Sequence, residues 1–481
     1  MNKHLVAHYL CRITAAGSLL FLVPVIICVV YGEWEDAKIF LIVAAGTALL
    51  SAPAALKKPK DNDVFAREGL MVVALLWVLY PVAGAMPFYL SGQIPSFVDA
   101  VFESISGFTT TGSTILTDIE SLSHGMLFWR SFTHWVGGMG VLVLAIAVLP
   151  GNKAAMHFMR AECAGPQVGK IVPKGKNSAR YLYIIYSVLT LVFFFLLMAG
   201  GMPWFDSICH AMGTAGTGGF GVKNAGIAYY NSPYIEYVLT IGMAMFGVNF
   251  SIYYMILSGH MKNALKNAEL RMYFIIMAAA TLIITVGNRN IYSSLEENFR
   301  YAVFQVSSIM TSTGFATADY SQWPEFSQTV LLILMFIGAC AGSTGGGLKV
   351  QRIIIMFRSV KKFVRQTLSP KCVYVLKGED KSMDTSTVHG VQTYFILYIG
   401  LMLISLLLVS VDNADFATSF SSVVTCINNI GPGLNRVGPV ENFSFYSDFA
   451  KIVLSVDMLF GRLECLPVII MLSPSVWRSK F

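Results

Sequence analysis

The sequence predicts an all-α integral membrane protein with ten transmembrane helices. Three observations predict it: an apolar composition, ten apolar runs of membrane-spanning length, and a segment pattern that occurs four times. Of the 481 residues, 55% are hydrophobic and only 13% are charged, whereas soluble domains carry roughly a quarter charged residues. A chain of this length with so few charges needs many lipid-facing segments. It also contains no polar stretch long enough to form a separate soluble domain.

The predicted crossings follow from the length of the apolar runs, because about 20 residues of helix span the ~30 Å hydrocarbon core. Runs of this kind occur at 13–31, 38–56, 66–89, 126–149, 180–201, 234–258, 271–288, 326–356, 389–411 and 446–472. The first run continues from Ala15 to Tyr31, which is longer than the apolar core of a signal peptide. We therefore expect it to be a retained helix.

The loops between these runs alternate in charge. One set is rich in Lys and Arg, around 57–60, 153–180, 262–271 and 349–381. The other set carries Asp and Glu, around 33–36, 118–120, 296–297, 319–325 and 412–415. Since cytoplasmic loops collect Lys and Arg, we expect the first set and both termini to be cytoplasmic.

Four outer segments are too short and too mixed to cross, at 93–125, 202–233, 291–325 and 412–445. Each begins with a half-length apolar or amphipathic stretch and then reaches a turn of small residues rich in Thr, Gly and Asn. The turns align on Gly112, Gly218, Gly314 and Gly431. The order helix, half-helix, turn, helix therefore occurs four times after two leading helices. The expected boundaries are 1–62 for the leading pair and 63–152, 153–265, 266–382 and 383–481 for the four repeats.

The four turns predict a shared cation pathway. Non-helical backbone cannot face lipid, so four such turns must line one aqueous cavity. Glycine permits the backbone conformations that turn carbonyls inward, and a ring of carbonyls replaces the hydration shell of a cation. The C-terminal ends of the half-helices also favour positive charge. No carboxylate ring occurs in the turns, which disfavours a divalent cation. A single Thr-Gly turn is more typical of helix packing, but four aligned turns favour a filter.

A second irregular segment is predicted within the run 326–356. The glycine-rich residues 342–347 cannot form a stable helix, so their backbone must also face the cavity. The alternative is a close helix contact of small residues. Arg462 lies within the last run, near Asp457 and Glu464. Such a charge is costly in a membrane and is either a positive barrier in the pathway or part of an internal salt bridge. Lys349 either adds a second positive charge or reaches to the interface.

The cysteines, two histidines and the basic segment 349–381 give weaker indications of function. The eight cysteines form no CxxC pair and are expected to be small buried apolar residues. For His134 and His210, packing or a satisfied buried ring is the favoured interpretation. The basic segment 349–381 is expected to bind lipid headgroups or an acidic partner.

The four turns, the segment Gly342–Lys349 and the sequence Gly461-Arg462-Leu463-Glu464 resemble the Trk/Ktr/HKT superfamily, most closely its TrkH-type potassium-translocating subunits. The resemblance covers nearly the whole chain and implies four M1–pore helix–filter loop–M2 repeats around one pore. It implies filter residues at Thr110, Thr111, Gly112, Gly216, Thr217, Gly218, Ser312, Thr313, Gly314, Asn429, Ile430 and Gly431. It implies a gate of an intramembrane loop and nearby charges, at Gly342, Gly345, Gly346, Gly347, Lys349 and Arg462.

The resemblance also implies a function. It implies potassium uptake, with rubidium as a substitute ion, across the bacterial inner membrane by a gated pore that is not an enzyme. Family members that favour sodium often carry Ser where Gly112 stands here, which points to potassium. The expected partners are a second copy of the chain and a cytosolic TrkA-like nucleotide-binding subunit. No nucleic acid is expected, and no cofactor other than the transported potassium ion.

Two further functions remain as alternatives. A potassium symporter coupled to protons or sodium would place several ionisable groups along its path. Here Arg462, Glu464 and Asp457 are the only obvious cluster, which favours gated conduction. A membrane enzyme would need a catalytic constellation near the interface, and the sequence shows none.

Overall fold

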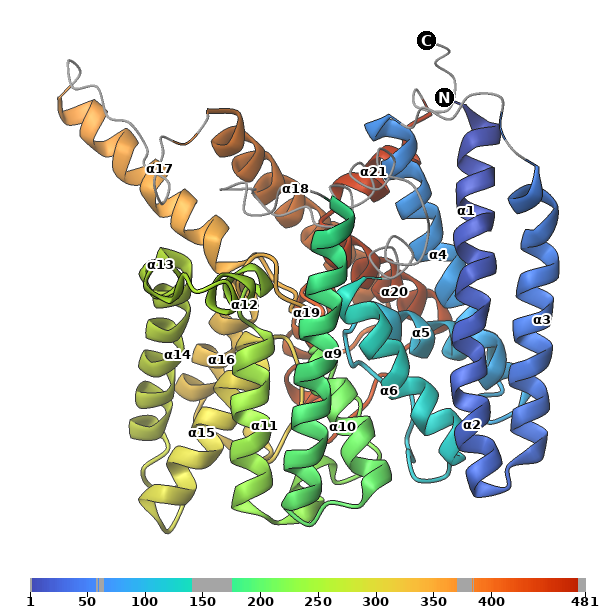
Figure 1. The fold of residues 1–481 in the computed structure, drawn as a ribbon. Helices are drawn as coiled ribbons and strands as arrows, with labels where there is room; N and C mark the ends of the chain where they lie inside the picture. The colour runs from blue at the N-terminus through green and yellow to red at the C-terminus, as the bar shows by residue number, and fades with distance from the viewer. Residues whose placement is uncertain are drawn as a thin grey trace.

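The structure is a computed structural model that describes residues 2–57, 59, 65–140, 175–369, 383 and 385–474. All regular secondary structure within these ranges is helical (Figure 1). The predicted basic residues at 58, 60, 153–174 and 371–381 lie outside the described residues, as does the last part of the predicted crossing 126–149.

The two leading helices stand at one side of the molecule (Figure 1). They are built from α1 (Lys3–Gly17), the 3-10 turn η1 (Ser18–Phe21), α2 (Leu22–Tyr31) and α3 (Trp34–Leu56). The Asn2 side chain accepts from the N–H of Leu5 at 3.1 Å and caps α1. Gly32, with φ +74°, ends α2 and lets the chain reverse into α3. The predicted crossings 13–31 and 38–56 are confirmed as long apolar helices.

Four units follow, each with a long helix, a half-helix, a turn and a second helix. The long helices are α4 (Ala66–Leu90), α9 (Gly175–Ala199), α14 (Ala268–Gly287) and α18 (Thr385–Val409). The half-helices are α5 (Phe97–Phe108), α10 (Trp204–Gly216), α15 (Leu295–Met310) and α19 (Phe416–Ile427). The second helices are α6 (His124–Met139), α11 (Pro233–Phe246), α16 (Glu325–Ile337) and α20 (Asp448–Arg462).

The remaining helices connect or extend these units. Short helices follow α11 and α20, namely α12 (Phe250–Leu257), α13 (Met261–Lys266) and α21 (Leu466–Leu472). A longer one, α17 (Val350–Leu368), follows α16 and projects away from the body on the face where α1 begins and α21 ends (Figure 1). We call this face the terminal face. Single 3-10 turns lie in the loops at η2 (Gly226–Tyr230), η3 (Tyr320–Gln322), η4 (Ser410–Asp412) and η5 (Asn435–Val437).

The half-helices are short because local sequence starts them late. The side chains of Ser96, Ser294 and Asp415 each accept a hydrogen bond from the backbone N–H three residues on, and so cap α5, α15 and α19. Pro203 precedes α10. Each half-helix has 12 to 16 residues, about 18–24 Å of helix, which is too little to cross a bilayer.

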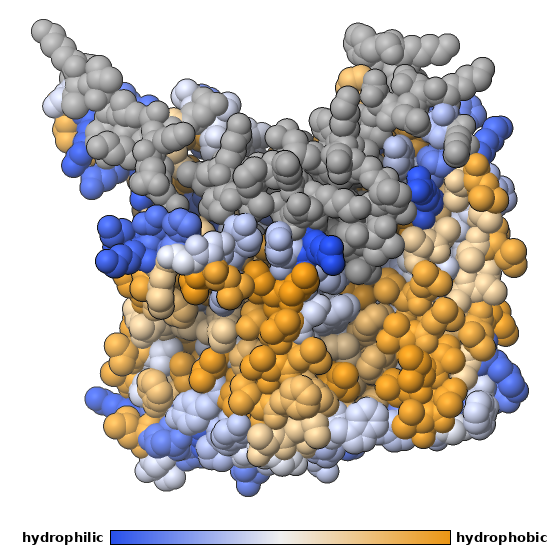
Figure 2. All heavy atoms as spheres, viewed as in Figure 1, coloured by the Kyte–Doolittle hydropathy of each residue, from blue (hydrophilic) through white to orange (hydrophobic). Residues whose placement is uncertain are grey.

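The chain is a multi-pass membrane protein. Six described helices are long and apolar enough to cross a membrane, and a bent pair makes a seventh candidate. Figure 2 shows an apolar band across the side of the body in view, with hydrophilic residues above and below it. The predicted crossings at 66–89, 180–201, 271–288 and 389–411 are confirmed as four of these helices.

Three predicted crossings are interrupted helices. The crossing 234–258 consists of α11 and α12, which meet at 90°, because Gly247 ends one helix and Asn249 caps the next. The crossing 326–356 is non-helical from 338 to 349, which confirms the predicted break. The crossing 446–472 is broken between α20 and α21, where Glu464 and Cys465 both have positive φ.

Candidate functional site

The four turns meet in a closed ring. A methyl group placed on the glycine of one turn would lie against a carbonyl oxygen of the next turn. The four pairs, with the distance from that methyl carbon, are Gly112 to Gly218 (2.1 Å), Gly219 to Thr313 (2.0 Å), Gly314 to Ile430 (2.2 Å) and Gly431 to Thr111 (2.8 Å). The contacts run from the first turn to the second, third and fourth, and back to the first. Segments up to 320 residues apart in sequence therefore form one structure.

All four turns share one backbone conformation. In each, a left-handed residue is followed by a second residue and then by a glycine with positive φ. The left-handed residues are Thr110, Thr217, Ser312 and Asn429, with φ between 53° and 57°. The glycines are Gly112, Gly219, Gly314 and Gly431, with φ between 79° and 96°.

This comparison corrects the sequence alignment of the second turn by one residue. The residue equivalent to Gly112 is Gly219 and not Gly218, because Gly219 has the positive φ and contacts the next turn. Gly216 is the last residue of α10 and precedes the turn. The equivalent triplet is therefore Thr217-Gly218-Gly219. The other three predicted triplets, which end at Gly112, Gly314 and Gly431, are equivalent in the structure.

The ring presents four equivalent carbonyl oxygens. They belong to the residues before the glycines, namely Thr111, Gly218, Thr313 and Ile430. All four residues are buried. Among the described residues, no N–H or O–H group donates a hydrogen bond to these oxygens. Buried carbonyls without a donor are rare in folded proteins, and a cation is a partner that would satisfy all four together.

The half-helices direct their C-terminal ends at this ring. The last residues of α5, α10, α15 and α19 immediately precede the left-handed turns. The C-terminal end of a helix carries roughly half a negative charge, so four such ends make the ring favourable for a cation. Side chains also join the first and fourth turns, since Asn429 donates to the Thr111 hydroxyl at 2.9 Å and the Ser113 hydroxyl donates to the carbonyl of Gly431 at 3.2 Å.

A cavity of about 250 Å³ lies on the outer side of the ring and is lined by all four turn glycines. The loops that follow the turns form its wall, and they carry Lys223, Asp319 and Glu441. Nearby, the backbone N–H of Asn224 and the Lys223 ammonium hold the pKa of Glu120 below its ordinary value. The cavity gives the ring an opening on the face opposite the terminal face.

A buried ion pair supports two of the turns. Arg130 Nε donates to Glu103 Oε1 at 2.8 Å, and both side chains are about 99% buried or more. The Glu103 carboxylate also accepts from the N–H of Ile115 at 3.1 Å, just after the first turn. Arg130 Nη1 donates to the carbonyl of Gly221 at 3.1 Å, just after the second turn. The pair therefore ties the chain leaving one turn to the chain leaving the next.

His134 performs a similar role from the other side of the second turn. Its Nδ1 lies 2.8 Å from the carbonyl oxygen of Gly107, and its Nε2 accepts from the N–H of Phe220 at 3.2 Å. This pattern fits a neutral ring with the proton on Nδ1. A methyl group on Gly218 would overlap the ring at 2.3 Å. The predicted packing role of His134 is thereby confirmed.

The glycine-rich segment lies directly against the third and fourth turns. A methyl group on Gly346 would lie 2.1 Å from the carbonyl oxygen of Asn428, and one on Gly345 would lie 2.6 Å from that of Thr311. The N–H of Gly346 donates to the hydroxyl of Ser312 at 2.5 Å. The segment is therefore packed on the inner side of the ring.

Three hydrogen bonds hold the start of this segment on the second and third units. The N–H of Cys340 donates to the carbonyl of Gly247 at 3.1 Å. The N–H of Ala341 donates to Glu269 Oε1 at 2.6 Å. The carbonyl of Gly342 accepts from the N–H of Phe250 at 3.1 Å. Only the Glu269 contact uses a side chain.

Two positive side chains meet the segment near the ring. Arg462 Nη1 donates to the carbonyl of Thr344 at 2.8 Å and to the hydroxyl of Thr110 at 3.4 Å. Arg462 Nη2 donates to the carbonyl of Gly138 at 2.8 Å. Lys349 is buried, and its ammonium donates to the carbonyl of Gly345. One guanidinium therefore joins the segment, the first turn and α6.

The acidic residues beside Arg462 have other partners. Glu464 forms an ion pair with Arg352 of α17, and Asp457 accepts from the hydroxyl of Ser405 at 2.5 Å. The sequence suggested both residues as salt-bridge partners of Arg462. In the structure Glu464 contacts Arg352 and Asp457 contacts Ser405.

Comparison with known proteins places this geometry in a family. The sequence profile of TrkH, described as a cation transport protein, matches residues 37–479. The chain belongs to the TrkH family. This is a family of cation transport proteins and not of enzymes.

Relatives of known sequence and structure are similar over their full length. The Trk system potassium uptake protein TrkH of Salmonella typhimurium is 35% identical, with 97% of this chain and 99% of that protein covered. The Trk system potassium uptake protein TrkG of Escherichia coli is 33% identical, with 96% of each covered. The crystal structure of the potassium transporter TrkH from Vibrio parahaemolyticus superposes with a TM-score of 0.88 at 31% identity, over 99% of this chain and 100% of that one.

Several residues of the site were not found from the sequence. Gly219 was missed because two adjacent glycines offered two alignments. Glu103, Arg130 and Glu269 were missed although each is a charge inside or beside an apolar run, a signal that indicates pairing or function in a membrane. Arg352 was counted only as part of a basic loop.

Proposed function

We propose that this protein takes up potassium through a single pore formed by its four units, with the ring of turns as the selectivity filter. The observation that carries the proposal is the ring of four buried carbonyls, to which no group in the described part of the chain donates a hydrogen bond. The relatives named above are potassium uptake proteins. The filter residues are the three predicted triplets that end at Gly112, Gly314 and Gly431, together with Thr217-Gly218-Gly219.

The membrane topology that fits this function has ten crossings. The six long apolar helices and the interrupted pairs supply them, together with α6. Basic residues lie on α13 and α17, toward the terminal face, whereas the α2–α3 connection, the α5–α6 connection and the start of α15, which carry Glu33, Asp118 and Glu296, lie toward the opposite face (Figure 1). By the positive-inside rule, the terminal face is cytoplasmic and the cavity outside the ring faces the exterior of the inner membrane.

The glycine-rich segment is the gate in this proposal. It packs on the cytoplasmic side of the ring, and Arg462 and Lys349 place positive charge beside it. Positive charge next to the pathway opposes passage of a cation. The glycines provide the backbone freedom that a movement of the segment requires.

From the resemblance to the family we also propose that the chain forms two kinds of assembly. One is a homodimer with a pore in each subunit, and the other is a complex with a cytosolic TrkA-like nucleotide-binding subunit. The mass of the purified protein in detergent, with and without such a subunit, tests both.

The test of the proposed function is rubidium flux in proteoliposomes, measured in competition with potassium, sodium and lithium. Flux driven by the rubidium gradient alone, with potassium the strongest competitor, is the expected result. Flux that requires a proton or sodium gradient would assign the protein to the coupled symporters. The same assay on Gly112→Ser tests the filter, because a Cβ at Gly112 would lie 2.1 Å from the Gly218 oxygen, whereas real Cβ contacts stay beyond 3.0 Å.

We expect Gly112→Ser to lower the preference for potassium over sodium. The matched control is Gly46→Ser in α3, where an added Cβ meets nothing within 4 Å. An unchanged cation preference in Gly112→Ser, in a protein that folds, would remove the ring from the selectivity mechanism.

A further inference from the structure

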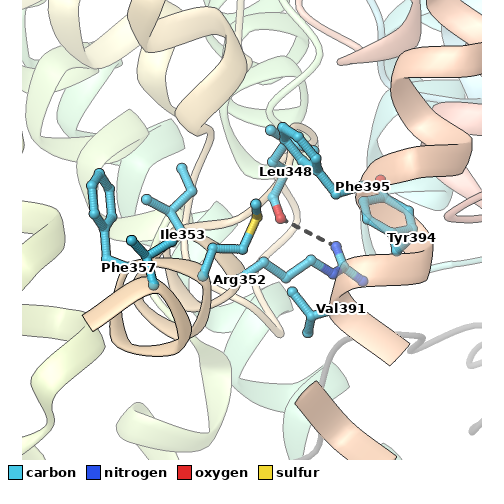
Figure 3. Close-up of a pocket in the computed structure, with 9 residues that line it drawn as sticks. Leu348, Arg352, Ile353, Phe357, Val391, Tyr394 and Phe395 are labelled. Atoms are coloured by element: carbon cyan, nitrogen blue, oxygen red, sulfur yellow. Dashed lines mark hydrogen bonds between the residues drawn. The ribbon is translucent and has the colours of Figure 1, made fainter. Parts of the chain in front are cut away.

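An apolar groove of about 290 Å³ lies between α17 and α18, beside the glycine-rich segment (Figure 3). Its walls include Ile353 and Phe357 of α17 and Val391 and Phe395 of α18. Leu348, the residue before Lys349, closes one end. Most of the lining side chains are apolar, and Arg352 and Tyr394 are the two that carry a polar group. A surface of this kind favours an occupant with hydrocarbon chains over water or a polar ligand.

The groove lies at a depth where lipid chains are present. Phe395 is 14 residues from Val409 at the far end of α18, which corresponds to ~21 Å along the helix. The hydrocarbon core is ~30 Å thick. In the topology proposed above, on which this depth rests, the groove therefore opens within the cytoplasmic leaflet. Phe357 and Val360 are 73% and 60% exposed beside it.

The positive charge of α17 favours lipids with anionic headgroups. The helix carries five basic residues and no acidic residue between Val350 and Leu368. Arg358 lies between the lining residues Phe357 and Val360, and Lys361, Lys362 and Arg365 follow the groove within the next two turns. Basic clusters immediately cytoplasmic of a membrane segment attract anionic headgroups.

We propose that this groove binds an anionic phospholipid of the cytoplasmic leaflet, with one acyl chain between α17 and α18 and the headgroup at the basic residues of α17. The groove is continuous with the gate. Arg352 donates to the carbonyl of Leu348 at 3.2 Å, and its guanidinium lies 4.1 Å from the ring centre of Tyr394 (Figure 3). The same Arg352 pairs with Glu464. A lipid in the groove would pack against Leu348 and Arg352 and so stabilise one position of the glycine-rich segment.

The experiment is native mass spectrometry of the delipidated full-length protein titrated with phosphatidylglycerol or with phosphatidylcholine. Two variants test the two halves of the site. Lys361→Gln with Lys362→Gln removes headgroup charge, and Val391→Trp fills the groove. The control is Lys262→Gln with Lys266→Gln on α13, which removes the same charge on the same face. We expect at least fivefold tighter binding of phosphatidylglycerol, a fivefold or greater loss in both test variants, and little change in the control.

Three outcomes would overturn the proposal. Equal binding of the two lipids, or equal loss in the control, would exclude a specific anionic site. Loss of the dimer in Val391→Trp with lipid binding unchanged would show that a second copy of the chain fills the groove. Because lipid binding is measured on the protein alone, a failure of the flux assay leaves this result standing, and the two proposals are tested separately.

Discussion

Removal of the Glu269 side chain is expected to loosen the glycine-rich segment. Glu269 is buried, and its carboxylate accepts the N–H of Ala341 at 2.6 Å. A hydrogen bond from an N–H to a charged group contributes about 1.5–3 kcal/mol, and each 1.4 kcal/mol is a factor of about ten in an equilibrium. If release of the segment opens the pathway, Glu269→Ala should raise the open fraction by about 10- to 140-fold. The other two hydrogen bonds at Cys340 and Gly342 still hold the segment, so this range is an upper bound.

The assay is basal rubidium flux in proteoliposomes without added partner or nucleotide. Glu68→Ala is the matched control, because Glu68 is also a buried carboxylate in the first turn of a unit's long helix, in α4. Its described contact is with the N–H of Asn2 at 3.4 Å, away from the gate. Both substitutions remove a carboxylate from a helix N-terminus and so cost similar helix stability. Unchanged or lower flux in Glu269→Ala, with a thermal midpoint like that of Glu68→Ala, would show that the Glu269 contact does not hold the segment closed.

Three further predictions follow from contacts near the ring. Arg462→Gln should raise basal flux several-fold, because it removes positive charge and weakens the bond to Thr344; unchanged flux would contradict a barrier role. Glu103→Gln should destabilise the protein by about 3–5 kcal/mol, because it leaves the buried Arg130 charge unpaired, and a thermal midpoint like wild type would contradict this. The contact of Glu120 lowers its pKa, so its stabilisation of the outer loop should be present above pH ~4.5 and be lost as pH falls through the lowered pKa. Hydrogen exchange of the loop, with Glu120→Gln as a pH-insensitive control, checks the sign.

The positions of the four turns could be predicted from the sequence because they depend on local signals. Glycine and Thr or Asn after a half-length apolar stretch predict a turn that cannot cross the membrane, and the structure places a left-handed residue in each. The break within 326–356 was predictable for the same reason, since the glycines of that run oppose a helix. The second turn was aligned wrongly by one residue because Gly218 and Gly219 are adjacent, and only the positive φ of Gly219 and its contact with Thr313 distinguish them.

Long-range contacts could not be predicted. Arg352 and Glu464 are 112 residues apart in sequence and form an ion pair, whereas the sequence placed Glu464 beside Arg462 by proximity alone. The bend between α11 and α12 was also missed, because a single glycine at 247 and a capping Asn249 are common within apolar runs. The ion pair was missed because its two residues lie on different helices and leave no periodic signal in the sequence.

The closed ring has a consequence for how such a pore changes over generations. In a ring assembled from four identical chains, one mutation alters all four positions at once. Here a single chain supplies all four turns. One mutation can therefore alter one turn and leave the other three turns unchanged. The fourth turn, where Asn429 bonds across to Thr111 and Ile430 stands in place of a small or hydroxyl residue, already differs from the others in this way. If the ring is the filter, as proposed, its selectivity can therefore change in single-residue steps.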